Sequence, residues 1–288
     1  MTAVYKRELR SYFNSMIGYV FVAAVTLVIG IFFTVYNLRG GYPYFAFALS
    51  GTVVIFAFAV PILTMKSMAE ERRSRTDQML LTYPVSVTGV VLGKFLAMLT
   101  VFAIPLLIAC LCPLVIAKGG NGSYLIDYSA ILLFLFLGAM FVSIGMFISS
   151  LTESQLIAAV AAMVALLLLL LWDTLTAFIP ATVTASAAGF LILFALAALI
   201  FARSAAHPAV GIAIFGAGVI LTVLGATMKS TWFASALTGF LGMFSIYGPV
   251  SNFISNYLFD VKGLLYYLVM TVLFLFLTVQ SVQRRQYR

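Results

Sequence analysis

The sequence contains very little charge. Only 8% of its 288 residues are Asp, Glu, Lys or Arg, whereas 64% are hydrophobic. Soluble domains carry about 25% charged and about 45–50% apolar residues, because polar side chains must cover their surface. The shortage of charge therefore excludes a water-soluble fold and leaves no room for a large domain outside the bilayer. It indicates an all-α polytopic membrane protein that forms a single domain over residues 1–288.

Groups that perform chemistry are also scarce. The only histidine, His207, has no acidic or cysteine neighbours, and Cys110 and Cys112 lie together in one apolar run. Neither arrangement has the spacing of a zinc site or of a disulfide framework, so we expect no metal. The sequence also lacks a convergent set of His, Asp, Ser or Cys, which argues against an enzyme that acts within the membrane.

A nucleotide-binding loop is missing as well. The nearest approach to the phosphate-binding pattern G-x-x-x-x-G-K-[ST] is GVVLGK at residues 89–94, which is one residue short and is followed by Phe95. The chain is therefore expected to bind no nucleotide and no cofactor of its own. We assign its formal charge of +8 to basic residues beside membrane spans rather than to nucleic-acid binding.

Long uncharged runs, in contrast, are abundant. They cover residues 11–38, 40–65, 95–117, 128–152, 154–172, 174–202, 208–228, 230–259 and 263–283. A helix crosses a bilayer with about 20 apolar residues, so these runs predict about eight transmembrane helices. Nine crossings would put the two basic chain ends on opposite faces. The run 230–259 is interrupted by glycines, asparagines and Pro249, and we predict that it forms a re-entrant or interfacial loop on the outer side.

The basic residues follow the same topology. Eight crossings from a cytoplasmic N-terminus place twelve Lys and Arg residues inside and four outside, as the positive-inside rule requires. The inside set is Lys6, Arg7, Arg10, Lys66, Arg72, Arg73, Arg75, Lys94, Arg203, Arg284, Arg285 and Arg288, and the outside set is Arg39, Lys118, Lys229 and Lys262. We predict a multi-pass protein of the inner (cytoplasmic) membrane with both termini in the cytoplasm. The run 11–38 is too long for a cleaved signal peptide and predicts a retained anchor.

The first residues predict an amphipathic interfacial helix over residues 2–15. Apolar and aromatic side chains recur at helical spacing at Tyr5, Leu9, Tyr12, Phe13 and Met16, whereas Lys6, Arg7, Arg10 and Asn14 face the other way. The alternative is an extension of the first span with a charged collar. The residues assigned to the interfacial helix are Tyr5, Arg7, Leu9, Arg10, Tyr12 and Phe13.

Concentrated polar residues occur in the segment 67–86, between the second and third spans. Glu71 and Arg75 are spaced i,i+4, as are Arg73 and Asp77, which predicts a helix that continues the second span. Pro84 ends this helix and the chain then re-enters the bilayer. We predict a docking element on the cytoplasmic side, with a solvated charged loop as the alternative. Because i,i+4 pairs contribute only tenths of a kcal/mol, Glu71→Lys is expected to leave folding intact.

Two isolated acids have weaker signals. Asp173 follows a leucine run and Trp172, so it either lines a transport pathway or sits at a solvated helix end near the outer interface. Glu153 lies in the turn SSLTESQ, where Ser150 or Thr152 is expected to cap the next span, and it is a candidate second coupling contact.

Several segments resemble a known family. AEERRSRTDQMLLTYPVS followed by VVLGKF looks like the cytoplasmic coupling region of ABC-2-type ABC transporter permeases. FISSLTESQLIAA (147–159) is similar to the turn between spans four and five of that family, and residues 259–285 look like its last span. RELRSYFNSMIGYVF (7–21) is most similar to the permeases associated with bacterial gliding motility. Family members usually carry Gly-Thr-Glu where this chain has Arg75, Thr76 and Asp77.

The resemblance implies the following fold, partners and activity. The fold is a six-helix core with an added hairpin, here at 184–228. The assembly is a permease dimer, formed by two copies of one chain or by two homologous chains. Two ABC ATPase subunits join this dimer and bind ATP and Mg. Coupling residues implied by position are Glu70, Glu71, Arg72, Arg73, Arg75, Thr76, Asp77 and Glu153. The expected activity is ATP-driven export of a lipid-like or amphiphilic substrate. A secondary transporter or channel is the alternative, although the spans show no cluster of ionisable residues for ion coupling.

Overall fold

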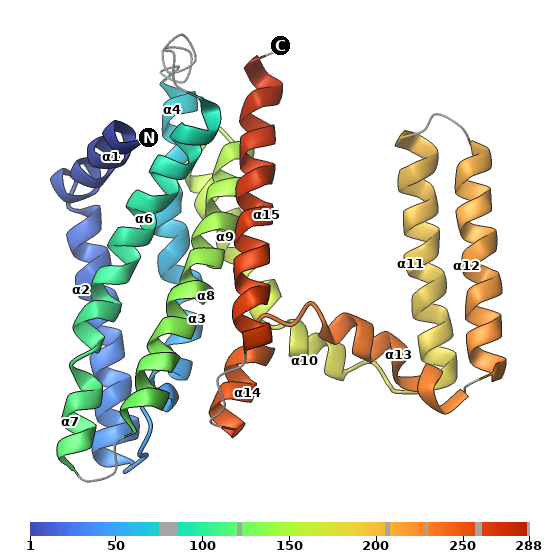
Figure 1. Cartoon of the computed structure of the whole chain (residues 1–288). Coiled ribbons are helices and arrows are strands. Elements are labelled where there is room, and N and C mark those ends of the chain that lie inside the picture. Colours follow the sequence, from blue (N-terminus) through green and yellow to red (C-terminus); the bar gives the residue numbers. More distant parts are fainter. Residues whose placement is uncertain (75–85, 120–122, 205–207, 229, 257–260, 287–288) are drawn as a thin grey trace. The chain divides into compact units, whose positions relative to one another are not determined.

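The computed structural model describes residues 1–74, 86–119, 123–204, 208–228, 230–256 and 261–286 (Figure 1). Every regular element in these residues is a helix, as the sequence predicted. The chain divides into two compact units. Unit 1 comprises residues 1–170 and 247–288, and unit 2 comprises residues 171–246.

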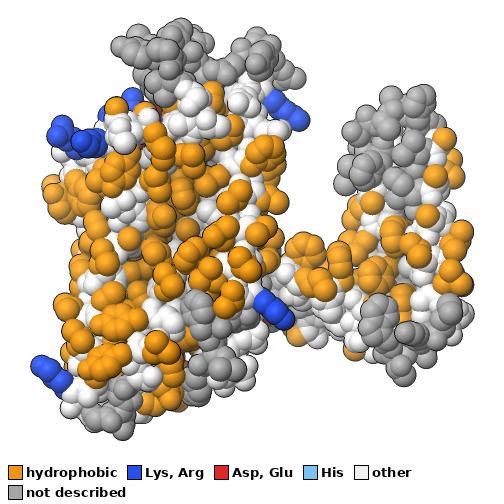
Figure 2. Space-filling view, viewed as in Figure 1, with side chains coloured by type: hydrophobic (Ala, Val, Ile, Leu, Met, Phe, Trp, Pro, Cys, Tyr) orange, Lys and Arg blue, Asp and Glu red, His pale blue; other side chains and the backbone are white. Residues whose placement is uncertain are grey.

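Unit 1 is a bundle of long helices with short helices at its ends. Its elements are α1 (Thr2–Asn14), α2 (Ile17–Phe33) with the π-helix η1 (Thr34–Arg39), α3 (Ala46–Thr64), α4 (Lys66–Arg73), α6 (Val87–Ala109), α7 (Cys112–Lys118), α8 (Tyr124–Leu151), α9 (Gln155–Leu170), α14 (Gly248–Asn256) and α15 (Val261–Gln286). Figure 2 shows hydrophobic side chains covering much of the visible flank of this unit. A hydrocarbon environment is the one in which such a surface is stable.

Within the described residues, five helical stretches are long and apolar enough to cross a membrane. They are Ile17–Arg39, Ala46–Arg73, Val87–Lys118, Tyr124–Leu151 and Val261–Arg284. Shorter apolar helices cover Gln155–Leu170, Val183–Leu199, Phe215–Thr227 and Phe233–Gly242. The chain is therefore a multi-pass membrane protein. The count of eight crossings stays a prediction.

Helix α8 forms the centre of unit 1, where it packs against α3, α6, α9 and α15. Phe56 of α3 contacts two aromatic rings, Phe134 of α8 and Phe102 of α6. The ring centroids of Phe56 and Phe102 are 5.2 Å apart in an edge-to-face arrangement. Close approach depends on glycine, because a Cβ on Gly138 would collide with Phe102. The α8 axis is thus held by tight packing on several sides.

The N-terminal helix is separate from the first span. Between α1 and α2 the backbone of Met16 adopts φ 58°, a left-handed conformation that is uncommon for a residue other than glycine. This turn breaks the helix and lets α1 cross over α6. The alternative of a continuous extended span is therefore wrong. Within unit 1, α1 and the end of α15 lie at the same end of the bundle as α4 (Figure 1).

Unit 2 contains α10 (Trp172–Ala177), α11 (Val183–Ser204), α12 (Pro208–Met228) and α13 (Ser230–Gly242). Helices α11 and α12 pack along each other as the expected hairpin. The indole N–H of Trp172 donates to Leu241 O at 2.8 Å, and the Ser186 hydroxyl donates to Ala234 O at 2.8 Å. The predicted non-crossing run 230–259 contains two short helices, α13 in unit 2 and α14 in unit 1, instead of one continuous helix.

Candidate coupling site at the charged end of unit 1

The predicted charged helix after the second span is present as α4. Only Met65 separates it from α3, and the backbone there stays helical. Arg72 and Arg73 lie in the last turn of α4, where positive charge is favourable beside the negative end of the helix dipole. The polar side chains of α4 therefore extend from a helix that is anchored in the bundle.

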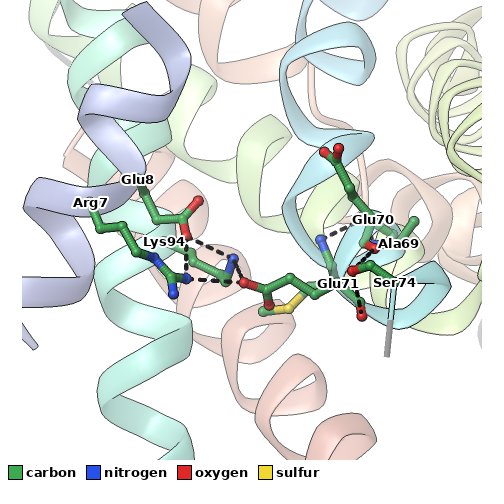
Figure 3. A network of polar contacts seen from close by, with 9 residues as sticks. Arg7, Glu8, Ala69, Glu70, Glu71, Ser74 and Lys94 are labelled. Atoms are coloured by element: carbon green, nitrogen blue, oxygen red, sulfur yellow. Dashed lines mark hydrogen bonds and ion pairs between the residues drawn. The ribbon is translucent and has the colours of Figure 1, made fainter. Parts of the chain in front are cut away.

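Four charged side chains from three helices close into a ring at this end. The Glu8 carboxylate on α1 accepts hydrogen bonds from Arg7 Nη2 at 2.7 Å and from Lys94 Nζ at 3.1 Å. The Glu71 carboxylate on α4 accepts from the same Arg7 Nη2 at 3.1 Å and from Lys94 Nζ at 2.8 Å. Figure 3 shows Lys94, from α6, between the two carboxylates. We call Arg7, Glu8, Glu71 and Lys94 the charge ring.

The charge ring is neutral and largely removed from water. The Lys94 side chain is only 2% exposed, and those of Glu8 and Glu71 are 14% and 19% exposed. A buried ammonium is tolerated when charge-assisted hydrogen bonds replace its hydration, and Lys94 makes two. The hydrogen bond to Glu8 raises the pKa of Arg7, which is half-exposed, above its ordinary value. The ring thus ties α1, α4 and α6 together at the charged end of the bundle.

Gly93 makes this arrangement sterically possible. A Cβ at this position would lie 3.2 Å from Met1 O and 3.2 Å from Val4 Cβ, so α1 passes directly over the α6 backbone. The adjacent Lys94 can then reach Glu8. The VVLGKF segment therefore has two adjacent structural roles: Gly93 lets α1 cross closely over α6, and Lys94 supplies the buried cation of the charge ring.

A serine on α8 holds the joint between α3 and α4. The Ser149 hydroxyl is fully buried, donates to Met65 O at 3.1 Å, and accepts weaker contacts from Met68 N at 3.3 Å and Ala69 N at 3.2 Å. Since Met65 is the N-cap residue of α4 and provides no side-chain cap, Ser149 satisfies backbone groups at the start of that helix. These hydrogen bonds therefore link the start of α4 directly to α8.

The two predicted coupling segments meet in the structure. Arg72 on α4 donates from Nη2 to Glu153 Oε1 at 3.0 Å and from Nη1 to Ser150 O at 3.4 Å, across the turn between α8 and α9. The Ser150 hydroxyl contacts the Ser281 hydroxyl of α15 at 3.2 Å and donates to Phe147 O at 2.6 Å. Segments far apart in the sequence thus form one polar junction.

Helix α1 has the predicted two-sided character, but its apolar face covers protein. Tyr12 is buried and its hydroxyl donates to Leu63 O at 3.1 Å, while the Tyr5 hydroxyl contacts Thr100 Oγ1 at 3.1 Å. Leu9 and Phe13 are half-buried and Arg10 is exposed. Met16 was expected on the apolar face, which is wrong: it lies in the turn after α1 and is 75% exposed.

Besides Glu153, which is exposed in the turn between α8 and α9, the assigned coupling residues fall into three groups. Glu71 and Arg72 are turned into the bundle, whereas Glu70 and Arg73 are exposed on α4. The remaining residues, Arg75, Thr76 and Asp77, lie outside the described residues, as do the predicted Glu71–Arg75 and Arg73–Asp77 pairs and Pro84. Because Glu71 belongs to the charge ring, the expectation that Glu71→Lys leaves folding intact does not hold. A lysine there would place a third cation beside Lys94 and Arg7.

Asp173 belongs to unit 2, where it lies in the first turn of α10. Its Oδ2 accepts a hydrogen bond from the Ser245 hydroxyl at 2.7 Å. The carboxylate is partly buried within its own unit. The pathway role stays a prediction.

Three charged residues with buried contacts were missed by the sequence reasoning. Glu8 is the single acid in a basic helix and Lys94 is a lysine within an apolar run, and both signals were available. Asp127, in the first turn of α8, is fully buried and its Oδ1 accepts the Phe45 N–H at 2.8 Å. A span therefore contains one buried acid, which is not a cluster of ionisable residues. Among the described residues, no cluster of three His, Cys, Asp or Glu side chains suited to a metal ion occurs.

The comparisons with known proteins identify the family. The model of the family described as ABC-2 family transporter protein matches residues 3–286, nearly the whole chain. No curated protein and no solved structure matches the chain. Members of this family are membrane transport subunits, not enzymes themselves, and generally pair with an ABC ATPase subunit. The chain therefore belongs to the ABC-2 transporter family and is a membrane-spanning permease subunit of an ABC transporter.

Proposed function

We propose that this permease is the membrane part of an ATP-driven exporter, in which an ATPase partner drives the helices through α4 and the α8–α9 turn. The observation that carries the proposal is the Arg72–Glu153 ion pair at 3.0 Å. It links both segments that the sequence assigns to coupling, and the charge ring extends the link to α1 and α6. A force on α4 would reach several helices at once.

Energetic considerations support this role. An exposed ion pair contributes at most about 1 kcal/mol, so Arg72–Glu153, with Glu153 71% exposed, is easily exchanged for contacts to a partner. A partner shifts the conformational equilibrium only by its differential affinity for the two states. Glu70 and Arg73, which point outward from α4, are suitable contacts for such a partner.

The remaining features follow from the same proposal. ATP and Mg would bind to two partner ATPase subunits, and the permease would form a dimer with a second copy or a homologous chain. The small number of charges in the spans favours a lipid-like or amphiphilic cargo over a small hydrophilic ion. We place the charged end of unit 1 on the cytoplasmic side of a bacterial inner membrane. The similarity of residues 7–21 favours the gliding-motility type of permease.

Co-purification tests the proposal directly. The complex is isolated from native membranes, the partner ATPase is identified, and its cargo-stimulated ATP hydrolysis is measured for Glu70→Lys and Arg73→Glu. Loss of one partner from a desolvated ion pair at an interface costs about 2–5 kcal/mol, so both variants should lose partner binding or coupling while membrane abundance stays normal. Both side chains are exposed, so the fold should tolerate these changes.

Lys118→Glu is the matched control, because Lys118 is exposed at the end of α7, away from α4. It should leave partner binding and hydrolysis unchanged. Full coupling in both α4 variants would show that the exposed charges of this helix are not partner contacts. ATP hydrolysis by the purified permease after removal of every partner would also contradict the proposal.

A further inference from the structure

The outward face of α1 forms a basic groove of about 670 Å³. Apart from Ala3, the side chains that line it are polar or cationic, and none is acidic: Lys6, Arg7, Arg10, Ser11, Asn14 and Ser15. Lys6 and Arg10 are spaced i,i+4, so their like charges repel on the helix surface. Among the described residues, no carboxylate lies within ion-pair distance of either one. An anion in this groove would relieve that repulsion.

An apolar groove of about 230 Å³ adjoins the basic one. The two share Ser15, and the apolar part continues between α2 and α3 over Met16, Val20, Ala24, Ala59 and Ile62. Met16, Val20 and Ile62 are 75%, 64% and 52% exposed. These residues border the candidate spans Ile17–Arg39 and Ala46–Arg73, so this groove faces hydrocarbon.

The order of the two grooves matches the order of groups in a phospholipid. A headgroup phosphate needs cations and hydrogen-bond donors at the interface, and an acyl chain needs an apolar path into the bilayer. Figure 2 shows basic side chains gathered over the position of α1, above the hydrophobic flank of the neighbouring helices. We propose that unit 1 binds one anionic glycerophospholipid here, with its phosphate on Lys6, Arg7 and Arg10 and one acyl chain between α2 and α3.

This site is connected to the coupling region through one residue. Arg7 lines the basic groove and also donates from Nη2 to Glu8 and Glu71 in the charge ring. Its guanidinium has five donors and its side chain is 53% exposed, so it can contact a phosphate and the ring together. The lipid would therefore bind beside the joint between α1 and α4. The proposal depends on the membrane location of the chain and not on export.

Lipid titration of the purified full-length protein tests the site. Dioleoylphosphatidylglycerol and dioleoylphosphatidylcholine are added in detergent, and bound lipid is counted by native mass spectrometry. The wild type should bind one phosphatidylglycerol more tightly than phosphatidylcholine. In Lys6→Gln/Arg10→Gln this preference should fall about 20- to 30-fold, since each basic residue near a membrane surface contributes about fivefold in affinity. Arg7 is left unchanged so that the charge ring stays intact.

A second variant tests the apolar groove. Ala24→Phe adds a bulky side chain at an exposed position of α2 and should weaken phosphatidylglycerol binding without any change in charge. Lys118→Gln/Arg284→Gln removes two exposed cations elsewhere and should bind like the wild type.

Three results would overturn the proposal. The first is equal preference for phosphatidylglycerol in Lys6→Gln/Arg10→Gln and the wild type. The second is inorganic phosphate competing as well as the lipid, which would indicate a free-anion site. The third is loss of ATPase co-purification in Lys6→Gln/Arg10→Gln with unchanged lipid selectivity, which would make this face a protein interface.

Discussion

The two ends of unit 1 are joined by different kinds of bond. At the α4 end, charged side chains contact one another, in the charge ring and in the Arg72–Glu153 pair. At the opposite end, polar side chains contact the backbone. Asp127 accepts the Phe45 N–H at 2.8 Å, and Asn37 Nδ2 donates to Tyr42 O and Tyr44 O at 2.9 and 3.0 Å.

This difference suggests a division of mechanical roles. The Arg72–Glu153 pair, whose glutamate is 71% exposed, can exchange partners at little cost, whereas a side chain bonded to a buried backbone group holds one chain path. Asp127 also lies near the N-termini of both α8 and α3, where helix dipoles favour its negative charge. We infer that the Asp127 end is the fixed end and that the α4 end rearranges during coupling.

An all-or-none test concerns which membrane face each end occupies. After replacement of Cys110 and Cys112 by alanine, Ser74→Cys should be labelled only after permeabilisation of cells, and Lys118→Cys should be labelled from outside. Both positions are in described regions at opposite ends of unit 1. Labelling of Ser74→Cys in intact cells would contradict the prediction that α4 is cytoplasmic.

The largest stability effect is expected at Lys94. Lys94→Met removes the cation from two carboxylates that are mostly buried, and such uncompensated charge costs about 3–5 kcal/mol. Denaturant unfolding in detergent measures this loss. The triple variant Glu8→Gln/Glu71→Gln/Lys94→Met should regain most of it, because the stranded charges are gone. If the triple variant is as unstable as the single one, packing at Lys94 is the cause.

A smaller effect is expected at the fixed end. Asp127→Ala leaves the Phe45 N–H buried without its acceptor, which costs about 1–3 kcal/mol. Asp127→Asn keeps an acceptor oxygen and should lose less stability in the same unfolding assay. Neither change should alter coupling to the ATPase beyond its effect on abundance. Selective loss of coupling in Asp127→Asn would show that this end also moves.

The smallest effect is a pH dependence at Tyr12. Burial raises the pKa of its phenol above the ordinary value of 10.0, so the unfolded chain releases this proton first. The associated stability is present below pH 10 and is lost as pH rises further. Tyr12→Phe should flatten the alkaline decline between about pH 10 and 11, while Tyr19→Phe, at an exposed position, should not. If the free energy of unfolding falls equally with rising pH in the wild type, Tyr12→Phe and Tyr19→Phe, the Tyr12 phenol is not buried.

The sequence was most informative where one residue type dominates a long run. Apolar runs predicted the helices, and the i,i+4 charges after Lys66 predicted that α4 continues α3. The site was predicted only in part, because a charge pattern on one helix shows which face is polar but not which helix lies against it. Glu71 was therefore assigned to Arg75 along its own helix, although Lys94 contacts it from α6.

By itself, the sequence determined that the chain is helical, that it spans a membrane several times and that its charged residues concentrate in the segment after the second span. These properties follow from composition and local spacing, which need no knowledge of the neighbours. Only the tertiary structure decided that Glu8, Glu71 and Lys94 meet, that Ser149 caps α4 and that α1 covers α6 at Gly93. The hydrogen bonds among them join residues up to 86 positions apart, and helix packing alone brings such residues together.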